Sequence, residues 1–408
     1  MNSAALDRVF RDASGRIVAA LASRFRHIDL AEDSFADACE KAVEVWQRDG
    51  VPNDPAAWLY RTAFRCAIDA LRRHRTEARY ASHVQPENGN DDSIDDEILI
   101  PDERLRLVFI CCHPAVAIEA RAALTLRLIC GLTAREIARA FIIPEATLAQ
   151  RLIRAKRKIA EAGIPFEVPG PDAWPERLDA VLSTVEVAYS KAHEDAAGSG
   201  PYAGFAAEML ELTRVLAELL NNEPEALALS AIIRFAEARR PARVDSQGMM
   251  IPISEQDPAR WNHALIEEAS HYLKRAIELH SDQPRVIQAC IHATWCSRQD
   301  LTNPAPWHAI LTLYDALLEV RDDAIVRLNR AVALAEVSGV NEALDELNSL
   351  ATGLKEFPPF YAVRADLLRR AGKIEEAISA YDIALALVPT SAERRWLEKK
   401  KTDMMLNK

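Results

Sequence analysis

Polar and basic residues between positions 147 and 158 have the types and spacing of a surface that binds DNA. Thr147, Arg151, Arg154 and Lys158 are spaced by 4, 3 and 4 residues, so in an α-helix they share one face. Such side chains contact phosphates and base edges in the major groove. The full candidate set is Thr147, Gln150, Arg151, Arg154, Lys156, Arg157 and Lys158. For an isolated basic helix, a solvated surface face is the alternative interpretation.

An apolar stripe with the same spacing, Leu148, Leu152, Ala155 and Ile159, predicts the buried side of this helix, and Pro144 suits its first turn. A shorter helix should precede it. Thr133 and Glu136 form a capping box, with Ile137 and Phe141 on the buried side. Two short helices joined by a tight turn predict a helix-turn-helix, which favours DNA binding over the solvated-face interpretation.

Bulk composition is that of a globular chain. The residues are 49% hydrophobic and 27% charged, which is ordinary for a globular protein. The length of 408 residues predicts two to four domains. No apolar run approaches the roughly 18 residues of a membrane span, and the first twenty residues are too charged for a signal peptide. The 7 cysteines lack disulfide-like spacing. We therefore expect a cytoplasmic protein that does not contact a membrane.

The net charge of -11 is unevenly distributed along the chain. Residues 104–163 carry about +7, residues 76–103 about -8, the first 75 residues about +1, and the remainder about -11. The acidic residues therefore lie mainly outside the predicted DNA-binding segment.

The first 80 residues predict a helical domain. A helix over 29–49 should bury an apolar stripe of Ala31, Phe35, Ala38, Ala42 and Val45, with acidic residues outside. A second helix over 56–75 should bury Tyr60, Phe64, Ile68 and Leu71. Basic residues of this helix beside Trp58 could bind phosphates and unstacked bases. The alternative interpretation is that Trp58 lies in the core and that the arginine run only complements the helix C-terminus; the sequence favours neither.

Two linkers divide the chain. Residues 81–101 are polar and acidic, and residues 164–175 are rich in proline. The first separates the domain over 1–80 from the helix-turn-helix domain over 102–163. Cys111, Cys112 and His113 favour a buried helix end over a zinc site, because adjacent cysteines lack the usual two-residue spacing. We expect no metal and no cofactor.

Residues 176–408 are helical in pattern throughout. Ala331 and Ala343 lie 34 residues before Ala365 and Ala377, which is the period of a tetratricopeptide repeat. Earlier helices match less closely, and such pairs stack into a solenoid that binds a protein or peptide. A long connection over 237–261 contains several Arg and Asp residues. It predicts either a polar binding surface or an ordered loop pinned by Arg and Asp pairs.

The order of these segments resembles an extracytoplasmic-function sigma factor of the sigma-70 family. DLAEDSFADACEKAVEVW is similar to its polymerase-binding segment, NDPAAWLYRTAFRCAIDALRRHR to the segment that reads the -10 element, and LTAREIARAFIIPEATLAQRLIRAKRKI to the -35 reader. The block RLVFICCHPAV, the loop EARRPARVD with EQDPARW, and the repeats resemble the subgroup with a tetratricopeptide-like extension. The resemblance implies an all-α chain of two small sigma domains followed by a helical-repeat solenoid.

Residue by residue, the resemblance implies that Asp33 and Asp37 face the clamp of the largest subunits of core RNA polymerase. The implied -10 contacts are Trp58, Arg61, Arg65, Arg72 and Arg73, and the implied -35 contacts are the residues of the basic helix. Ala36, Cys39 and Arg65 depart from the residues common at these positions in the family, as does YSKAHED at 189–195.

The expected function is promoter recognition as a subunit of RNA polymerase, with the extension modulating activity. The alternatives are a stand-alone helix-turn-helix regulator with a sensor domain, and a repeat scaffold with a vestigial DNA-binding half. No Gly-rich phosphate loop or HExxH helix is present, so the sequence predicts no enzyme and no catalytic residue.

Overall fold

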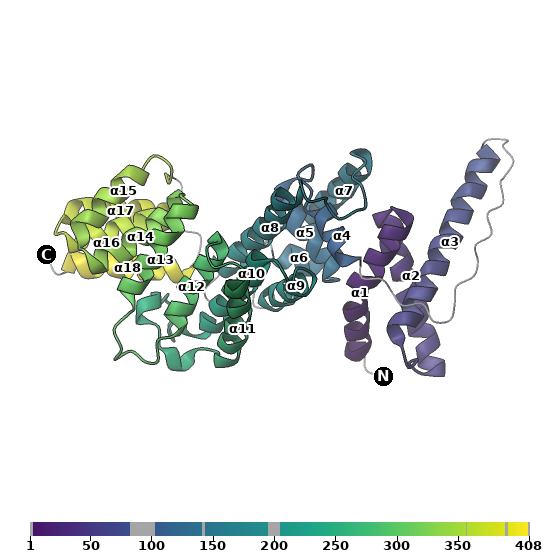
Figure 1. Cartoon of the computed structure of the whole chain (residues 1–408), viewed down its shortest axis with the longest axis horizontal. Helices are drawn as coiled ribbons and strands as arrows, with labels where there is room; N and C mark the ends of the chain where they lie inside the picture. Colours follow the sequence, from purple (N-terminus) through teal and green to yellow (C-terminus); the bar gives the residue numbers. More distant parts are fainter. Residues whose placement is uncertain are drawn as a thin grey trace. The chain divides into compact units, whose positions relative to one another are not determined.

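The computed structural model describes residues 3–81, 103–140, 143–194, 205–355, 357–387 and 391–406. The chain divides into two compact units, Met1–Ala188 and Tyr189–Lys408. In the described residues the regular elements are helices, and one isolated antiparallel bridge joins Val244 and Met250 (Figure 1). The prediction of an all-α chain is therefore confirmed.

The first part of unit 1 contains three long helices, α1 (Ser3–Phe25), α2 (Ile28–Asp49) and α3 (Pro55–Ala81). In α2, Ala31, Ala38 and Ala42 are buried as predicted, and Trp46 rather than Val45 completes the stripe. The Trp46 ring lies between Phe10 and Trp58, with ring centroids 5.7 and 5.4 Å away. Small alanines thus let the helices approach, and the aromatic rings close the end of the core.

The buried face of α3 differs from the predicted one. Leu59, Ala63, Cys66 and Ala67 are fully or almost fully buried, together with Tyr60. Of the other predicted residues, Phe64 and Ile68 are half-buried at the border of this face, and Leu71 is exposed. The predicted buried face was therefore wrong by about one residue around the helix. Two neighbouring stripes of α3 are apolar, and the packing of α1 and α2 decides which of them is buried.

The second part of unit 1 contains the predicted helix-turn-helix and the helices that support it. These are α4 (Arg104–Cys111), α5 (Ile118–Ile129), α6 (Ala134–Ala140) and α7 (Glu145–Glu161). Cys111 and Cys112 are buried, and Cys112 Sγ lies 3.5 Å from Thr125 Oγ1, so the predicted buried helix end is confirmed. The predicted acidic linker falls largely on residues 82–102, outside the described residues.

The boundary between the units falls inside α8 (Trp174–Glu194). The start of this helix packs on α4: the Trp174 ring lies 5.2 Å from that of Phe109, and Arg177 donates to the Phe109 carbonyl. The first half of α8 thus completes the core beneath the helix-turn-helix.

Unit 2 continues with paired helices. They are α9 (Phe205–Leu219), α10 (Pro224–Arg239), α11 (His263–Leu279), α12 (Pro284–Cys296), α13 (Trp307–Val320), α14 (Ala324–Val337), α15 (Val340–Leu350), α16 (Pro358–Arg370), α17 (Ile374–Leu387) and α18 (Ser391–Leu406). Ala331, Ala343, Ala365 and Ala377 each have 0% exposure, which confirms the 34-residue spacing as a packing period. Unit 2 is therefore a helical-repeat, solenoid-like domain.

The long connection between α10 and α11 is ordered by bonds to its own backbone. It contains three 3-10 turns, η1 (Arg240–Ala242), η2 (Ile253–Glu255) and η3 (Pro258–Arg260). Arg260 donates to the carbonyls of Pro241 and Val244, whereas Asp245 and Asp257 accept from backbone N–H groups. The ordered-loop interpretation is supported, although Arg260, Asp245 and Asp257 bond to the backbone rather than to each other.

Among the described residues, the structure contains no helix that is both long and apolar enough to cross a membrane.

Candidate nucleic-acid interface

The entry to the helix-turn-helix is fixed by the predicted capping box. Glu136 Oε2 accepts from the Thr133 backbone N–H at 2.7 Å, and Thr133 Oγ1 accepts from the Glu136 N–H at 3.2 Å. Ile137 has 0% exposure, as predicted, whereas Phe141 lies outside the described residues. Glu136 also accepts from Arg11 in α1 at 2.6 Å. One carboxylate therefore caps α6 and ties it to the first part of the unit.

Substituting Glu136 by Ala should lower the free energy of unfolding of unit 1 by about 1–2 kcal/mol, as for a lost helix cap. Burial alone would raise the pKa of Glu136, but the Thr133 hydrogen bonds and Arg11 outweigh it and lower the pKa. This stabilisation is therefore present above the ordinary carboxyl pKa and is lost as the pH falls through the lowered value. Urea unfolding at pH 7 and at acidic pH should show the difference between wild type and variant shrinking in acid; a difference that stays constant would contradict it.

Helix α7 buries the predicted apolar stripe, because Leu148, Leu152, Ala155 and Ile159 are its buried residues. On the neighbouring face, Arg154 and Lys158 are exposed and Arg151 is half-buried. Among the described residues, none of these three cations takes part in an ion pair. We call Arg151, Arg154 and Lys158 the basic stripe of α7.

A hollow of about 670 Å³ runs beside the basic stripe. Its other wall is made of Ala115, Ala117 and Ala120, with Glu119 at one edge. The alanines leave room next to the three cations, and an oxyanion in that space would meet guanidinium and ammonium groups with little steric hindrance. Thr147 and Gln150 precede the stripe, half-buried and exposed respectively, near the N-terminus of α7, where base-reading residues of such helices lie.

Lys156 does not belong to the basic stripe. It lies two residues, about 200° around the helix, from both Arg154 and Lys158, and so faces the opposite side of α7. There its Nζ contacts Asp29 and lies 3.0 Å from Glu32 Oε2, both in α2. Burial alone would lower the pKa of Lys156, but the two carboxylates raise it. In this conformation Lys156 is occupied by α2 and is not available to phosphate.

Arg157 is exposed and forms an ion pair with Glu161 at 2.6 Å, one turn further along α7. Exposed pairs of this kind are weak, so the pair leaves the guanidinium accessible to a phosphate. The structure thus brings together Arg151, Arg154 and Lys158, keeps Arg157 beside them, and places Lys156 elsewhere.

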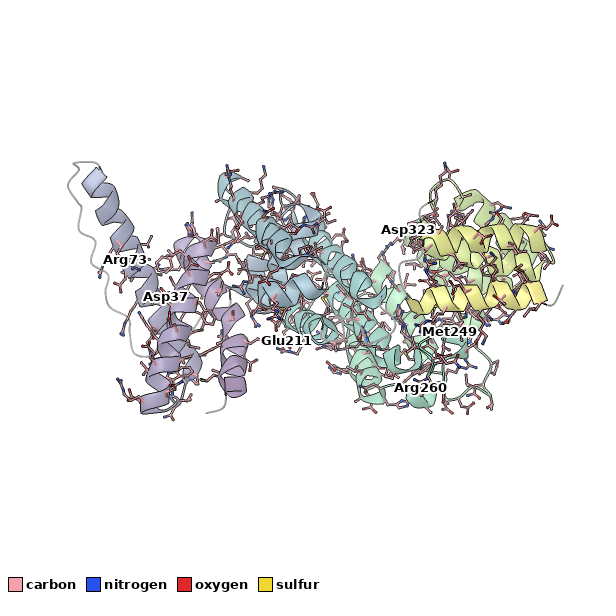
Figure 2. The ribbon with its side chains drawn as sticks, turned by 180° about the vertical axis from the view of Figure 1, so that it is seen from behind. Asp37, Arg73, Glu211, Met249, Arg260 and Asp323 are labelled. Carbon is pink, nitrogen blue, oxygen red and sulfur yellow. The ribbon has the colours of Figure 1, made fainter. Side chains whose placement is uncertain are left out.

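The predicted -10 residues are distributed along α3. Arg65, Arg72 and Arg73 are exposed, and Arg61 is half-buried; Figure 2 labels Arg73 on this helix. Trp58 is half-buried with its ring against Trp46, so it is partly a core residue. The arginines are therefore placed to follow a phosphate backbone, and Trp58 has a structural role as well.

Asp33 and Asp37 are exposed on α2, one turn apart on the same face, and Figure 2 labels Asp37 there. Glu40 and Glu44 continue this exposed acidic surface toward the end of the helix. The placement fits a contact with a basic protein partner, because the carboxylates point away from the α1–α3 core.

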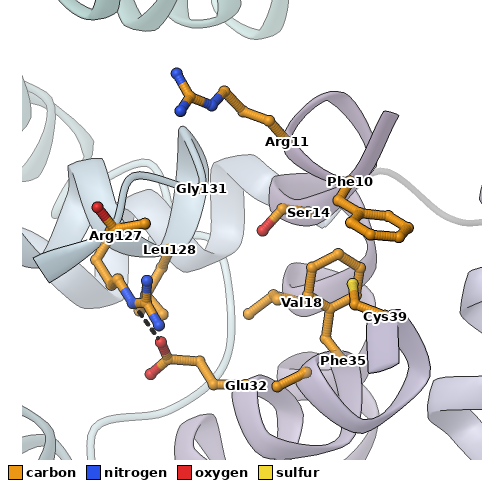
Figure 3. A pocket seen from close by; sticks show the side chains of 12 residues that line it. Phe10, Arg11, Ser14, Val18, Glu32, Phe35, Cys39, Arg127, Leu128 and Gly131 are labelled. Atoms are coloured by element: carbon orange, nitrogen blue, oxygen red, sulfur yellow. Dashed lines mark hydrogen bonds and ion pairs between the residues drawn. The ribbon is translucent and has the colours of Figure 1, made fainter. Parts of the chain in front are cut away.

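Sequence reasoning missed a cavity of about 440 Å³ between α1, α2 and the α5–α6 turn (Figure 3). Its apolar lining includes Phe10, Val18, Phe35 and Leu128. Across it, Arg127 Nε donates to Glu32 at 2.9 Å, the ion pair that Figure 3 draws as a dashed line. No sequence signal could have revealed this cavity, since the residues that line it come from segments about 90 residues apart in the chain.

A buried polar cluster in unit 2 was also missed. Glu237 accepts from Tyr189 Oη at 2.8 Å and from Arg240 Nε at 2.6 Å. Arg239, which has 7% exposure, donates to Cys296 Sγ at 3.2 Å and contacts His292 Nδ1 at 3.0 Å. The sequence left the arginines of this connection open between a polar binding surface and an ordered loop. In the structure Glu237 joins α10 to α8, and Arg239 joins α10 to α12.

Comparison with known proteins shows which families these segments match. Residues 106–159 match the family "Sigma-70, region 4", which spans α4 to α7, and residues 177–277 match a family of unknown function, DUF6596. "Uncharacterized protein R00370" of Rhizobium meliloti (strain 1021) is 34% identical over 402 residues, covering 96% of this chain and 94% of that protein. The chain belongs to the same family as that protein. Residues 106–159 are therefore similar to region 4 of sigma-70 factors, and the helix-turn-helix of α6 and α7 lies within this match.

Among solved structures, the chain is similar to yeast Tom70, with a TM-score of 0.38 and 12% identity, over 93% of this chain and 81% of that chain. Where the sequence predicted tetratricopeptide-like repeats from residue 176, DUF6596 covers the first hundred residues of that region.

Proposed function

We propose that the chain is a sigma factor of the extracytoplasmic-function type, which binds core RNA polymerase and directs it to promoters. The observation that carries this proposal is the coincidence of the region 4 match with a helix-turn-helix whose basic stripe includes two exposed cations, Arg154 and Lys158. The three arginines exposed on α3 and the acidic surface of α2 are the further surfaces that such a factor requires, and they support it.

In this proposal each surface has one task. Asp33 and Asp37 contact the clamp of the largest polymerase subunits. Arg61, Arg65, Arg72 and Arg73, with Trp58, follow the -10 element. Thr147, Gln150 and Arg151 read the -35 element, and Arg154, Arg157 and Lys158 contact its phosphates. The helical-repeat unit, tetratricopeptide-like in its last two helix pairs, modulates activity through a protein or peptide partner. None of these tasks needs catalysis or a cofactor.

The test is binding and transcription with the full-length chain. Purified core RNA polymerase should bind it in a gel-filtration or pull-down assay, and the complex should initiate transcription at discrete sites on genomic DNA. DNA binding without polymerase binding would instead support a stand-alone regulator with a sensor domain.

Within this proposal, Arg151→Ala should cost about 1–3 kcal/mol of promoter binding, and mainly at one position of the -35 element, because a guanidinium bonded to a base edge carries sequence information. Lys158→Ala should weaken all promoters alike, because a phosphate contact does not depend on sequence. Binding of the polymerase complex to a set of -35 variants measures both. Equal, sequence-independent losses from the two variants would remove Arg151 from the base-reading residues.

A further inference from the structure

Unit 2 buries three arginines among its described residues, and one of them has an unusual set of partners. Arg234, with 2% exposure, pairs with Glu268 at 2.6 Å, and Arg285, with 4%, pairs with Glu225 at 2.6 Å. Arg239 has 7% exposure, and the described residues give it a thiol and an imidazole in place of a carboxylate. A buried charge is costly unless an opposite charge offsets it, so Arg239 requires an explanation that the other two do not.

Both partners of Arg239 are neutral acceptors. A guanidinium has only N–H donors, so His292 accepts through Nδ1, 3.0 Å away, and its ring proton lies on Nε2. Cys296 accepts through Sγ at 3.2 Å. Burial raises the pKa of this thiol by more than Arg239 lowers it, so the sulfur stays uncharged. Neither group offsets the positive charge of Arg239.

Two further arginines follow directly after α10. Arg240 donates to both carboxylate oxygens of Glu237, at 2.6 and 2.7 Å. Arg243 is half-buried, and burial together with repulsion from Arg240 and Arg239 lowers its pKa to about 10, although Glu237 acts in the opposite direction. We call Arg239, Arg240 and Arg243 the α10 arginine cluster. Its surroundings disfavour positive charge, so an anion placed there would be stabilised by the guanidinium groups.

We propose that the α10 arginine cluster binds a small organic anion through a carboxylate or phosphate group. Arg243 and His292 are half-buried, so the cluster is reachable from solvent. Arg243 is then the contact residue, and Arg239 adds its charge from the interior. Guanidinium groups suit such a ligand because an oxyanion accepts two parallel N–H bonds from each of them.

Access limits the size of the ligand. A DNA duplex is too bulky to bring its phosphates to a side chain with 7% exposure, so Arg239 and its neighbours fit a small molecule. Near Arg239, burial raises the pKa of Tyr314 in α13 to about 12, and its phenol therefore remains a neutral hydrogen-bond donor for the ligand. The site lies within unit 2, so it stands whether or not the chain binds polymerase.

Isothermal titration calorimetry of the full-length chain tests the site, with sodium phosphate and sodium succinate as probes in chloride buffer of constant ionic strength. We expect binding, and Arg243→Gln should weaken it at least about tenfold, because a charge-assisted bidentate contact is lost. Arg154→Gln is the matched control. It removes a cation from the basic stripe of α7, the other surface that can hold an oxyanion, and should leave the affinity unchanged.

Tighter binding of phosphate would assign a phosphate-bearing ligand, and tighter binding of succinate a carboxylate. Hydrogen exchange of peptides from residues 237–243 and 290–296 locates the probe, and it should protect both. Absence of binding by either probe would overturn the site. Equal losses from Arg243→Gln and Arg154→Gln, or protection confined to α7, would overturn it as well.

A second measurement separates a binding arginine from a structural one. In chloride buffer, Arg239→Met should melt at the wild-type temperature or above, because it removes a buried charge that has neutral partners. Arg285→Met is the comparison, and it should melt several degrees lower, since it leaves the Glu225 carboxylate without its arginine. If Arg239→Met melts as low as Arg285→Met, Arg239 is a structural cation, and its part in the site is overturned.

Discussion

Reversing the charge of both Asp33 and Asp37 to arginine is expected to weaken binding to core RNA polymerase by at least about 100-fold, because like charges placed across an interface cost several kcal/mol. Both side chains are exposed on α2 and lie outside the α1–α3 core, so the double variant should fold normally. Titration of the full-length chain against fluorescently labelled core polymerase measures the loss.

The matched control for this variant is Asp12→Arg with Glu167→Arg. Both control residues are exposed, and the pair changes the net charge by the same amount without touching α2. It should keep affinity within about twofold at moderate salt, since exposed charges beyond a Debye length are screened. If both double variants lose affinity equally, the contact is a general charge effect and α2 is not the binding helix.

Replacing Glu237 by alanine should lower the free energy of unfolding of unit 2 by about 3–5 kcal/mol, the cost of removing one partner from a buried ion pair. The Glu237 side chain is 5% exposed and accepts from Tyr189 and from two nitrogens of Arg240. Burial, with repulsion from Arg240 and Arg239, lowers the pKa of Arg243 to about 10. The cluster is thus crowded with arginines, and Glu237 is a carboxylate that offsets them.

Glu218→Ala is the comparison for Glu237→Ala. Glu218 pairs with Arg214 on the surface of α9, with a side chain 51% exposed, so its loss should cost less than about 1 kcal/mol. Urea unfolding followed by hydrogen exchange of the α10 peptides assigns the effect to unit 2. A cost for Glu237→Ala as small as that of Glu218→Ala would mean that the arginines relax into solvent.

Periodicity predicted the elements that have a single apolar face. The buried stripe of α7 and the capping box at Thr133 follow from local spacing alone, and the structure has both. The alanines spaced by 34 residues in the repeats are likewise local in origin, because each helix pair packs on the next in the same way.

Tertiary packing decided what spacing could not. In α3, Leu59 and Ala63 form one apolar stripe and Tyr60 and Phe64 another, and only the positions of α1 and α2 determine which one is central. The basic residues of α7 are alike in sequence, yet Lys156 meets a carboxylate 124 residues earlier in the chain. Pairs this distant leave no pattern in a single sequence.

The Lys156 pair with Asp29 and Glu32 also bears on the effect of ionic strength. Added salt displaces a protein from DNA because counterions return to the phosphates, with a slope set by the number of phosphate contacts. Lys156 already has two carboxylates of α2 as its counterions, so it contacts no phosphate and releases no counterion from DNA. The slope of promoter binding with salt should therefore be smaller than a count of all the cations in α3 and α7 would give.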